Sequence, residues 1–109
     1  MVTVTFYKRR KNIVGFKGEG HSELKRRKNQ KDYICSAISA VMYMAVIGLG
    51  EVLKKKIEYK EGESGFLLCK LKEEGSEETE VIFESLIKTL EKIEREYKGN
   101  IKINYKEVD

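Results

Sequence analysis

The chain has 109 residues, of which 40% are hydrophobic and 37% are charged, and its net charge is +4. That length fits one compact domain, and the apolar residues are too numerous and too regularly placed for a disordered protein. One His and two isolated Cys offer no cluster of about four ligands for a structural zinc site. We therefore expect one domain over residues 1–109 without a structural metal.

The positive charge is concentrated between residues 8 and 31. This stretch contains ten Lys and Arg and two Glu, so it carries a net charge of +8 and the rest of the chain −4. Such a stretch attracts acidic partners, most simply RNA or a ribonucleoprotein surface. The commoner explanation of a charge run is a solvated loop, and charge alone leaves both open.

The most apolar segment runs from Ile34 to Leu53, but Glu51 and several small residues interrupt it. It therefore lacks the unbroken apolar length of a membrane span. The first eleven residues alternate apolar and polar side chains and do not resemble a secretory signal. We expect a cytoplasmic protein without a membrane anchor, in which Cys35 and Cys69 are reduced thiols.

The predicted elements begin with a hairpin. Residues 2–8 and 12–18 alternate β-branched or aromatic side chains with polar ones, around a polar turn at residues 9–11. Residues 20–31 show no apolar periodicity apart from Leu24, which predicts an exposed loop.

A central helix is predicted directly after Asp32, its N-cap, to about Lys55. Asp32 has a short acceptor side chain and directly precedes a long helical run. The apolar residues of this helix lie on nearly every face. We therefore expect it to pack on the sheet on one side and on a neighbouring helix or a second subunit on the other.

The second half of the chain predicts a hairpin, a helix and a last strand. Strands at residues 57–60 and 65–72 flank a polar turn, and Cys69 falls in the second strand as a small buried hydrophobe. A helix follows over about residues 77–98, and residues 101–108 alternate as a strand. The apolar residues of that helix recur at spacings of three and four: Ile82, Leu86, Leu90, Ile93 and Tyr97.

The order ββαββαβ predicts an α+β fold. Two helices packed on one mixed or antiparallel sheet would form a two-layer sandwich.

The residues able to carry chemistry gather at the start of the central helix. With Asp32 as N-cap, Cys35 is the third helical residue, where unpaired N–H groups and the positive end of the helix dipole favour a thiolate. His21, the only histidine, would supply the base of a cysteine–histidine pair. Asp32 is assigned to the cap, with help in orienting His21 as a lesser role. Helical spacing puts Ser39 on the same face, where it donates to the sulfur or a substrate carbonyl, or bonds back to its own preceding turn.

Gly15, Gly18 and Gly20 give the approach to His21 backbone freedom, and their amides, with those at the start of the helix, are candidate donors to an oxyanion. The loop over residues 22–31 is either a lid that closes over substrate or a floppy connection. A lone His and Cys fourteen residues apart form a weak motif, so the residues by themselves do not establish an enzyme.

The sequence "GEGH", a variable loop and then "DYICSAISAV" resemble the ribosomal-processing cysteine protease (Prp) family. In that family a Gly-His pair precedes an Asp-x-x-Cys-Ala-x-x-Ser-Ala helix start. The N-terminal hairpin, "IGL" late in the first helix and the ending "LEKIEREYKGNIKINY" also look like the family. The chain departs from the pattern at Ser36, which replaces the usual alanine, and in its unusually basic loop, which lacks a glycine just before Asp32.

The resemblance implies Cys35 as nucleophile and His21 as base, with Asp32 and Ser39 supporting them. It implies a small α+β homodimer that needs no metal or organic cofactor. Such an enzyme removes the N-terminal extension of a large-subunit ribosomal protein, after a phenylalanine-containing motif, and so supports ribosome assembly. The flexible loop between the catalytic pair would contact the peptide, through Gly20, Ser22, Lys25, Arg26, Arg27 and Lys28.

Two other hypotheses come from different classes of protein. The first is a non-enzymatic ribosome- or RNA-binding module that uses the basic stretch of residues 8–31. Only Tyr7 and Phe16 lie near those charges, which leaves little aromatic surface for base stacking. The second is a dimeric structural partner, in which the first helix serves only for packing.

Overall fold

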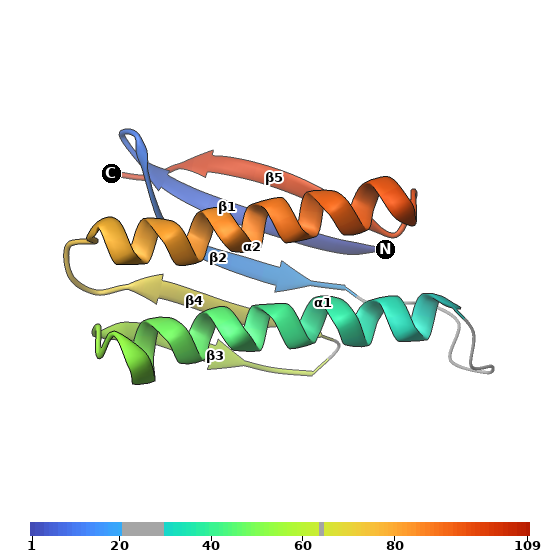
Figure 1. Cartoon of the computed structure of the whole chain (residues 1–109), viewed down its shortest axis with the longest axis horizontal. Coiled ribbons are helices and arrows are strands. Elements are labelled where there is room, and N and C mark those ends of the chain that lie inside the picture. Colours follow the sequence, from blue (N-terminus) through green and yellow to red (C-terminus); the bar gives the residue numbers. More distant parts are fainter. Residues whose placement is uncertain (21–29, 64) are drawn as a thin grey trace.

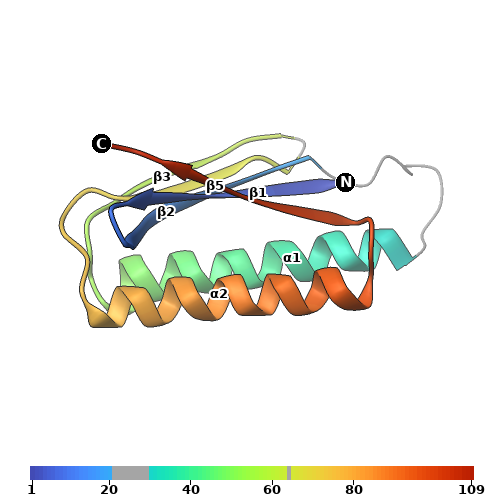
Figure 2. The same cartoon turned by 90° about the horizontal axis from the view of Figure 1, so that it is seen from above.

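The computed structural model describes residues 1–20, 30–63 and 65–109, with residues 30–32 as backbone only. Two helices lie side by side on one face of a five-stranded sheet (Figure 1 and Figure 2). The predicted α+β two-layer sandwich of order ββαββαβ is confirmed. In chain order the elements are β1 (Val2–Arg9), β2 (Asn12–Glu19), α1 (Gln30–Ile47), a π-helical turn η1 (Gly48–Val52), β3 (Ile57–Glu61), β4 (Leu67–Leu71), α2 (Glu77–Glu96) and β5 (Ile101–Glu107).

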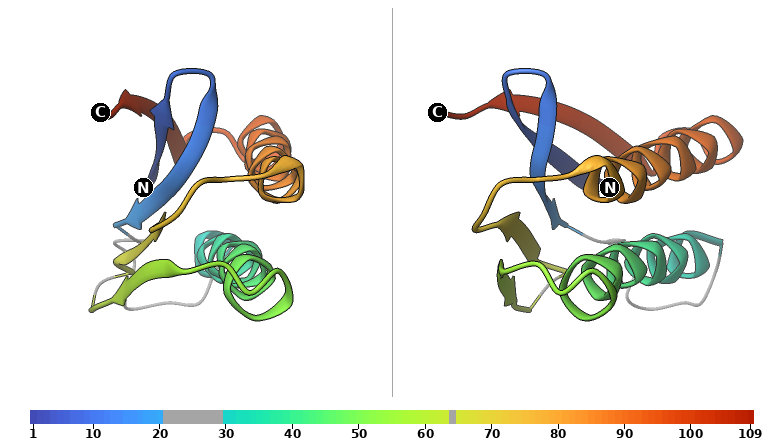
Figure 3. Two further views of the ribbon diagram at one scale, coloured as in Figure 1. Left: turned by 90° about the vertical axis from the view of Figure 1, so that its left-hand side faces the viewer. Right: turned by 60° about the vertical axis from the view of Figure 1, so that its left-hand side comes forward.

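The sheet has the strand order β3-β4-β2-β1-β5 and is mixed. β5 pairs with β1 in parallel, and the other three pairings are antiparallel. Both helices cover the same face, so the opposite face of the sheet is left open (Figure 3). The chemistry of that open face differs from that of the helical layer, as described below.

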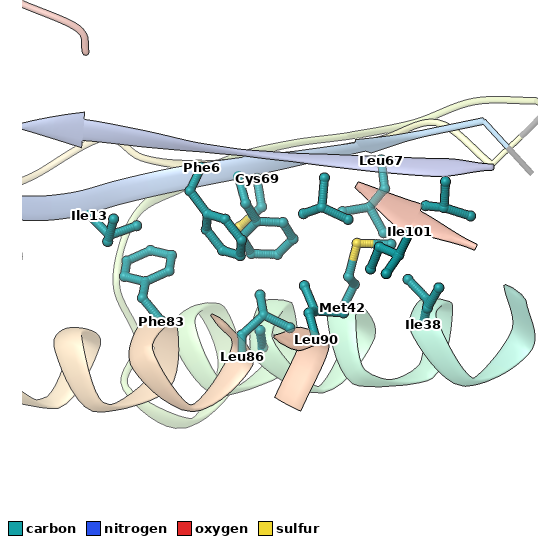
Figure 4. Close-up of a cluster of buried hydrophobic side chains, with 14 of the residues drawn as sticks. Phe6, Ile13, Ile38, Met42, Leu67, Cys69, Phe83, Leu86, Leu90 and Ile101 are labelled. Carbon is teal, nitrogen blue, oxygen red and sulfur yellow. The ribbon is translucent and has the colours of Figure 1, made fainter. Parts of the chain in front are cut away.

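The hydrophobic core lies between the sheet and the two helices (Figure 4). Phe16 of β2 is fully buried, with its ring centroid 6.1 Å from that of Phe6 and 6.4 Å from that of Phe83 on α2. Cys69 of β4 is also fully buried, which confirms its predicted role as a small hydrophobe. Burial raises the pKa of the Cys69 thiol to about 11.

Helix α2 has a clear start signal. The Ser76 hydroxyl accepts from the Thr79 backbone N–H at 3.2 Å, and the Thr79 hydroxyl oxygen accepts from the Ser76 N–H at 2.8 Å. This reciprocal pair is a capping box. Of the predicted apolar stripe, Leu86 and Leu90 are buried, and Ile82, Ile93 and Tyr97 pack partly buried against the core.

The predicted boundaries of α1 are wrong at both ends. The helix begins at Gln30, so Asp32 lies inside it and is not the N-cap. Gln30 and Lys31 are good helix formers, which allows the helix to extend upstream of Asp32. At the other end the α-helix stops at Ile47 and widens into η1 instead of continuing to about Lys55.

The glycines of η1 allow close packing there. A Cβ atom on Gly48 would lie 3.0 Å from Ile82 of α2, and one on Gly50 would lie 3.1 Å from Ile57 of β3. Small residues at these positions therefore let the end of the helical segment approach both its neighbouring helix and the edge strand.

Candidate active site

Helix α1 carries Cys35 on the flank that faces β3. Ile34, Ile38 and Met42 point into the core, and Cys35 is half-buried beside them. Ser39 follows one turn later and is also half-buried, which confirms that the two share a face. The thiol is therefore placed where core packing orients it and solvent still reaches it.

A shallow, open depression of about 350 Å³ lies over this part of α1. The lining contains the thiol and three hydroxyl groups, and consists of Cys35, Ser36, Ser39, Ala40 and Tyr43. An extended peptide fits such a surface better than a small enclosed ligand, because the depression is wide and lacks walls on most sides.

The earlier start of α1 changes the electrostatics expected at Cys35. Cys35 is the sixth residue of the helix and not the third. The unpaired N–H groups belong to the first four residues, and the dipole effect falls off within the first turn. The helix terminus would therefore stabilise a negative charge on the sulfur less than the sequence predicted.

The three glycines before His21 do not play one common role. Gly15 and Gly18 lie within β2, which pairs with β1 on one side and β4 on the other, so their amides belong to a strand inside the sheet. This argues against the predicted oxyanion role for these two. Gly20 has φ = +87°, and a Cβ there would lie 2.6 Å from the Met1 carbonyl oxygen, so this position requires glycine.

Several predicted site residues lie outside the described residues. They are His21 and the loop residues Ser22, Lys25, Arg26, Arg27 and Lys28. Asp32 is described as backbone only, within α1. The described part of the basic stretch does not gather in one place: Lys8 and Arg9 end β1 and residues 10–11 form the turn to β2, whereas Lys17 lies near the other end of β2.

A second cluster, about two helical turns along α1 from Cys35, was not found from the sequence. Glu61 of β3 accepts hydrogen bonds from the Tyr43 hydroxyl on α1 and, at 2.8 Å, from the Tyr59 hydroxyl. The Tyr43 and Tyr59 hydroxyls lower the pKa of Glu61, whereas burial and the Glu61 carboxylate raise the pKa of Tyr59 to about 12. The Tyr43–Glu61 bond ties α1 to the edge strand β3, whereas the Tyr59–Glu61 bond lies within β3.

Next to this cluster lies a mostly apolar depression of about 490 Å³. It is lined by Tyr43, Val46, Ile47, Gly50, Glu51, Lys55, Ile57 and Tyr59. Because Tyr43 lines both depressions, they meet along α1. The one signal in the sequence was the spacing of four that connects Cys35, Ser39, Tyr43 and Ile47.

Metal chemistry has no candidate among the described residues: no three His, Cys, Asp or Glu side chains of residues 1–20, 30–63 and 65–109 come together to hold an ion. Cys35 and Cys69, both of which are described, form no disulfide.

A half-buried thiol that lines an open depression supplies one part that a thiol-dependent peptidase requires, the nucleophile. The chain belongs to the cysteine protease Prp family, whose model matches residues 1–102. No curated protein matches the chain significantly.

Solved structures agree with this assignment at the level of the fold. The ribosomal processing protease Prp from S. aureus, in complex with a covalently linked product peptide, is 22% identical and covers 97% of this chain and 100% of its own, with a TM-score of 0.83. The same protease with a substrate peptide is 23% identical over the same shares, with a TM-score of 0.81. SMU.848 from Streptococcus mutans is 16% identical, covers 99% of this chain and 96% of its own, and has a TM-score of 0.81.

Proposed function

We propose that the chain is a cytoplasmic cysteine endopeptidase that removes the N-terminal extension of a large-subunit ribosomal protein. Membership of the Prp family carries this proposal. The S. aureus protease that shares the fold has been solved with both a substrate peptide and a covalently linked product peptide. A covalent product is what a cysteine nucleophile leaves on the enzyme before hydrolysis.

In the proposed mechanism the Cys35 sulfur attacks the scissile carbonyl carbon and His21 accepts the thiol proton. Backbone amides stabilise the oxyanion of the tetrahedral intermediate. His21 then protonates the leaving amine, and water hydrolyses the thioester to free the thiol. Ser39, one helical turn from Cys35, would bond to the sulfur or to the substrate carbonyl, and Asp32 would help to orient His21.

We infer that the peptide lies along the flank of α1. The rise from Cys35 to Ile47 is about 18 Å at 1.5 Å per residue. An extended peptide covers that distance in about five residues. An apolar side chain about five residues from the scissile bond would then occupy the depression lined by Val46, Ile47 and Ile57.

A peptide that copies the N-terminus of the candidate ribosomal protein tests this function. Mass spectrometry of the wild-type reaction should show one cut, and aspartate scanning of the peptide should slow cleavage most at the scissile bond and about five residues from it. An uncut peptide would overturn the protease proposal. If the peptide is cut but an aspartate about five residues from the scissile bond does not slow cleavage, only the placement along α1 is overturned. The alternative, a non-enzymatic RNA-binding module on residues 8–31, gains no support from the comparisons.

We also propose that the enzyme is a homodimer whose interface includes the outer face of α1. Tyr33 and Met44 are large apolar side chains that stay exposed there and do not line the depression proposed for the peptide. Contrary to the expectation from the sequence, the segment Tyr33–Val52 is long and apolar enough, by length and composition, to cross a membrane. Its inner side packs on the sheet, and 28% of the segment is buried. A second copy would cover the exposed side, since patches of this kind mark interaction sites.

Met44→Glu is therefore expected to convert the dimer to a monomer, because it puts a charge in the apolar interface. Sedimentation velocity measures the change, from twice the 12.6 kDa chain mass to the chain mass itself. Val81→Glu on α2 is the matched control, since Val81 is 64% exposed and Met44 65%. A monomeric wild type, or equal dissociation of the control, would refute the proposed interface.

A further inference from the structure

The open face of the sheet is rich in lysine. Val4, Phe6, Phe16 and Cys69 point to the helices, so the residues that alternate with them point the other way. The strand pairings arrange these outward residues in rows that cross the sheet. One row is Lys106, Tyr7, Gly15, Lys70 and Glu58; the next is Asn104, Thr5, Lys17, Leu68 and Lys60; the third includes Lys102, Thr3 and Glu19.

Positive charge exceeds negative charge on this face. Five lysines project from it, against the two glutamates Glu19 and Glu58. Each glutamate lies near one lysine, at 3.5 Å from Lys17 and 3.7 Å from Lys60. Exposed ion pairs of this kind are weak and exchange readily with other charged partners. The lysines therefore remain available to an anionic ligand.

Packing in the first row holds the Lys70 side chain across β2, over Gly15. Gly15 stands between Tyr7 and Lys70 and has no side chain, so the Lys70 chain crosses over it and places Nζ 4.4 Å from the centre of the Tyr7 ring. A Cβ on Gly15 would lie 2.8 Å from Lys70 Cγ. Tyr7, which is buried by this contact, has Lys106 opposite it on β5. Lysines thus flank the centre of the face.

The other layer has the opposite charge. Helix α2 contains seven glutamates and three Lys or Arg residues. Figure 2 shows both helices on one side of the sheet, and the strand pairings put the lysine rows on the other side. The molecule is therefore polarised, and its field would orient a polyanion toward the open face.

We propose that the open face of the sheet binds the phosphate backbone of RNA, at a site separate from the peptide site. Lysine is depleted in protein–protein interfaces and enriched where proteins meet nucleic acid. Among the described residues, none of the large apolar side chains that are exposed lies in these rows, so a lipid surface finds nothing to insert. Thr5 and Asn104 add polar groups that hydrogen-bond to phosphate or sugar.

The contacts are mainly to phosphates, because the Tyr7 ring is covered by Lys70 and is not free to stack on a base. Binding is therefore independent of sequence and sensitive to salt. Cys35 lies on α1, on the other side of the sheet, so RNA and peptide are bound at the same time. The choice of RNA over DNA rests on the proposed function, since the substrate is a ribosomal protein; the lysine rows do not depend on it.

The test measures fluorescence anisotropy of a labelled single-stranded RNA of mixed sequence at 50 to 200 mM salt. The test variant is Lys70→Gln with Lys102→Gln and Lys106→Gln. The matched control, Lys88→Gln with Lys92→Gln and Lys98→Gln, removes the same charge from and just after α2. We expect the test variant to bind at least tenfold more weakly at 50 mM salt, with a salt slope smaller by about 2, at 0.7 for each phosphate contact. The control should stay within twofold of wild type.

Because Lys70 packs on Tyr7, the double variant Lys102→Gln with Lys106→Gln provides a second measurement on exposed positions of β5 alone, with an expected loss of at least threefold. Peptide cleavage by every variant should match wild type, which separates this site from the protease proposal. The proposal fails if wild type does not bind RNA at 50 mM salt, or if the α2 control loses as much affinity as the test variant. It also fails if phosphatidylserine vesicles bind more tightly than RNA.

Discussion

Replacing Cys35 with alanine is expected to lower kcat/KM for the peptide by at least about 1,000-fold while the protein stays folded. Loss of a nucleophile removes the covalent route altogether, and such losses commonly reach several orders of magnitude. The thiol is only half-buried at the flank of α1, so its removal leaves little cavity. His21→Ala should reduce kcat/KM to a similar extent, because the proposed nucleophile and base would act as a unit.

Cys69→Ala is the matched control, because it removes the other thiol. Cys69 is fully buried in β4, on the core side of the sheet, and should be dispensable for cleavage. Circular dichroism of each variant shows whether the fold is retained. Cleavage by folded Cys35→Ala at more than a tenth of the wild-type rate would rule out Cys35 as the nucleophile.

Phe83→Ala is expected to lower the free energy of unfolding by about 3–5 kcal/mol, the range found for a large aromatic side chain removed from a core. Phe83 is fully buried on α2 and meets the edge of the Phe16 ring from β2 at 6.4 Å. The substitution therefore weakens the contact that holds α2 on the sheet. Urea denaturation measures the change.

Val81→Ala, two residues earlier on the exposed side of α2, provides the comparison and should change stability by less than about 0.5 kcal/mol. A loss below about 1 kcal/mol for Phe83→Ala would contradict the placement of α2 over the aromatic cluster.

Most of the fold was predictable because its elements have simple periodicities. Alternation with a period of two located β1 and β2 to within one residue at each end, and apolar spacings of three and four located α2. The sheet order was not predictable, because a strand pattern does not say which partner it pairs with. The parallel pairing of β1 with β5 joins residues about 100 positions apart.

The start of α1 shows the limit of cap signals. Asp32 has the right side chain for an N-cap, but Gln30 and Lys31 favour helix as well, and the helix includes them. The predicted stripe of α2 omitted Phe83, although an apolar face is wide enough to bury it beside Ile82.

The site was predictable where it depends on one helix and not where it depends on several strands. The shared face of Cys35 and Ser39 follows from helical spacing and is confirmed. The contact of Tyr43 with Glu61 needed the position of β3, which sequence spacing does not provide. The lysines of the open face were likewise hidden, because they come from separate strands and form no run, whereas the run at residues 8–31 does not form one patch among its described residues.

The assignment of Cys35 as nucleophile is tested most directly by trapping it. A substrate peptide that ends in an aldehyde or vinyl sulfone, incubated with the native enzyme and followed by digestion and mass spectrometry, should modify Cys35 alone. Cys69 should stay unmodified, since it is fully buried and its pKa is about 11. Modification of Cys69 instead, or unimpaired cleavage with Cys35 left unmodified in the presence of the electrophile, would contradict the proposed nucleophile.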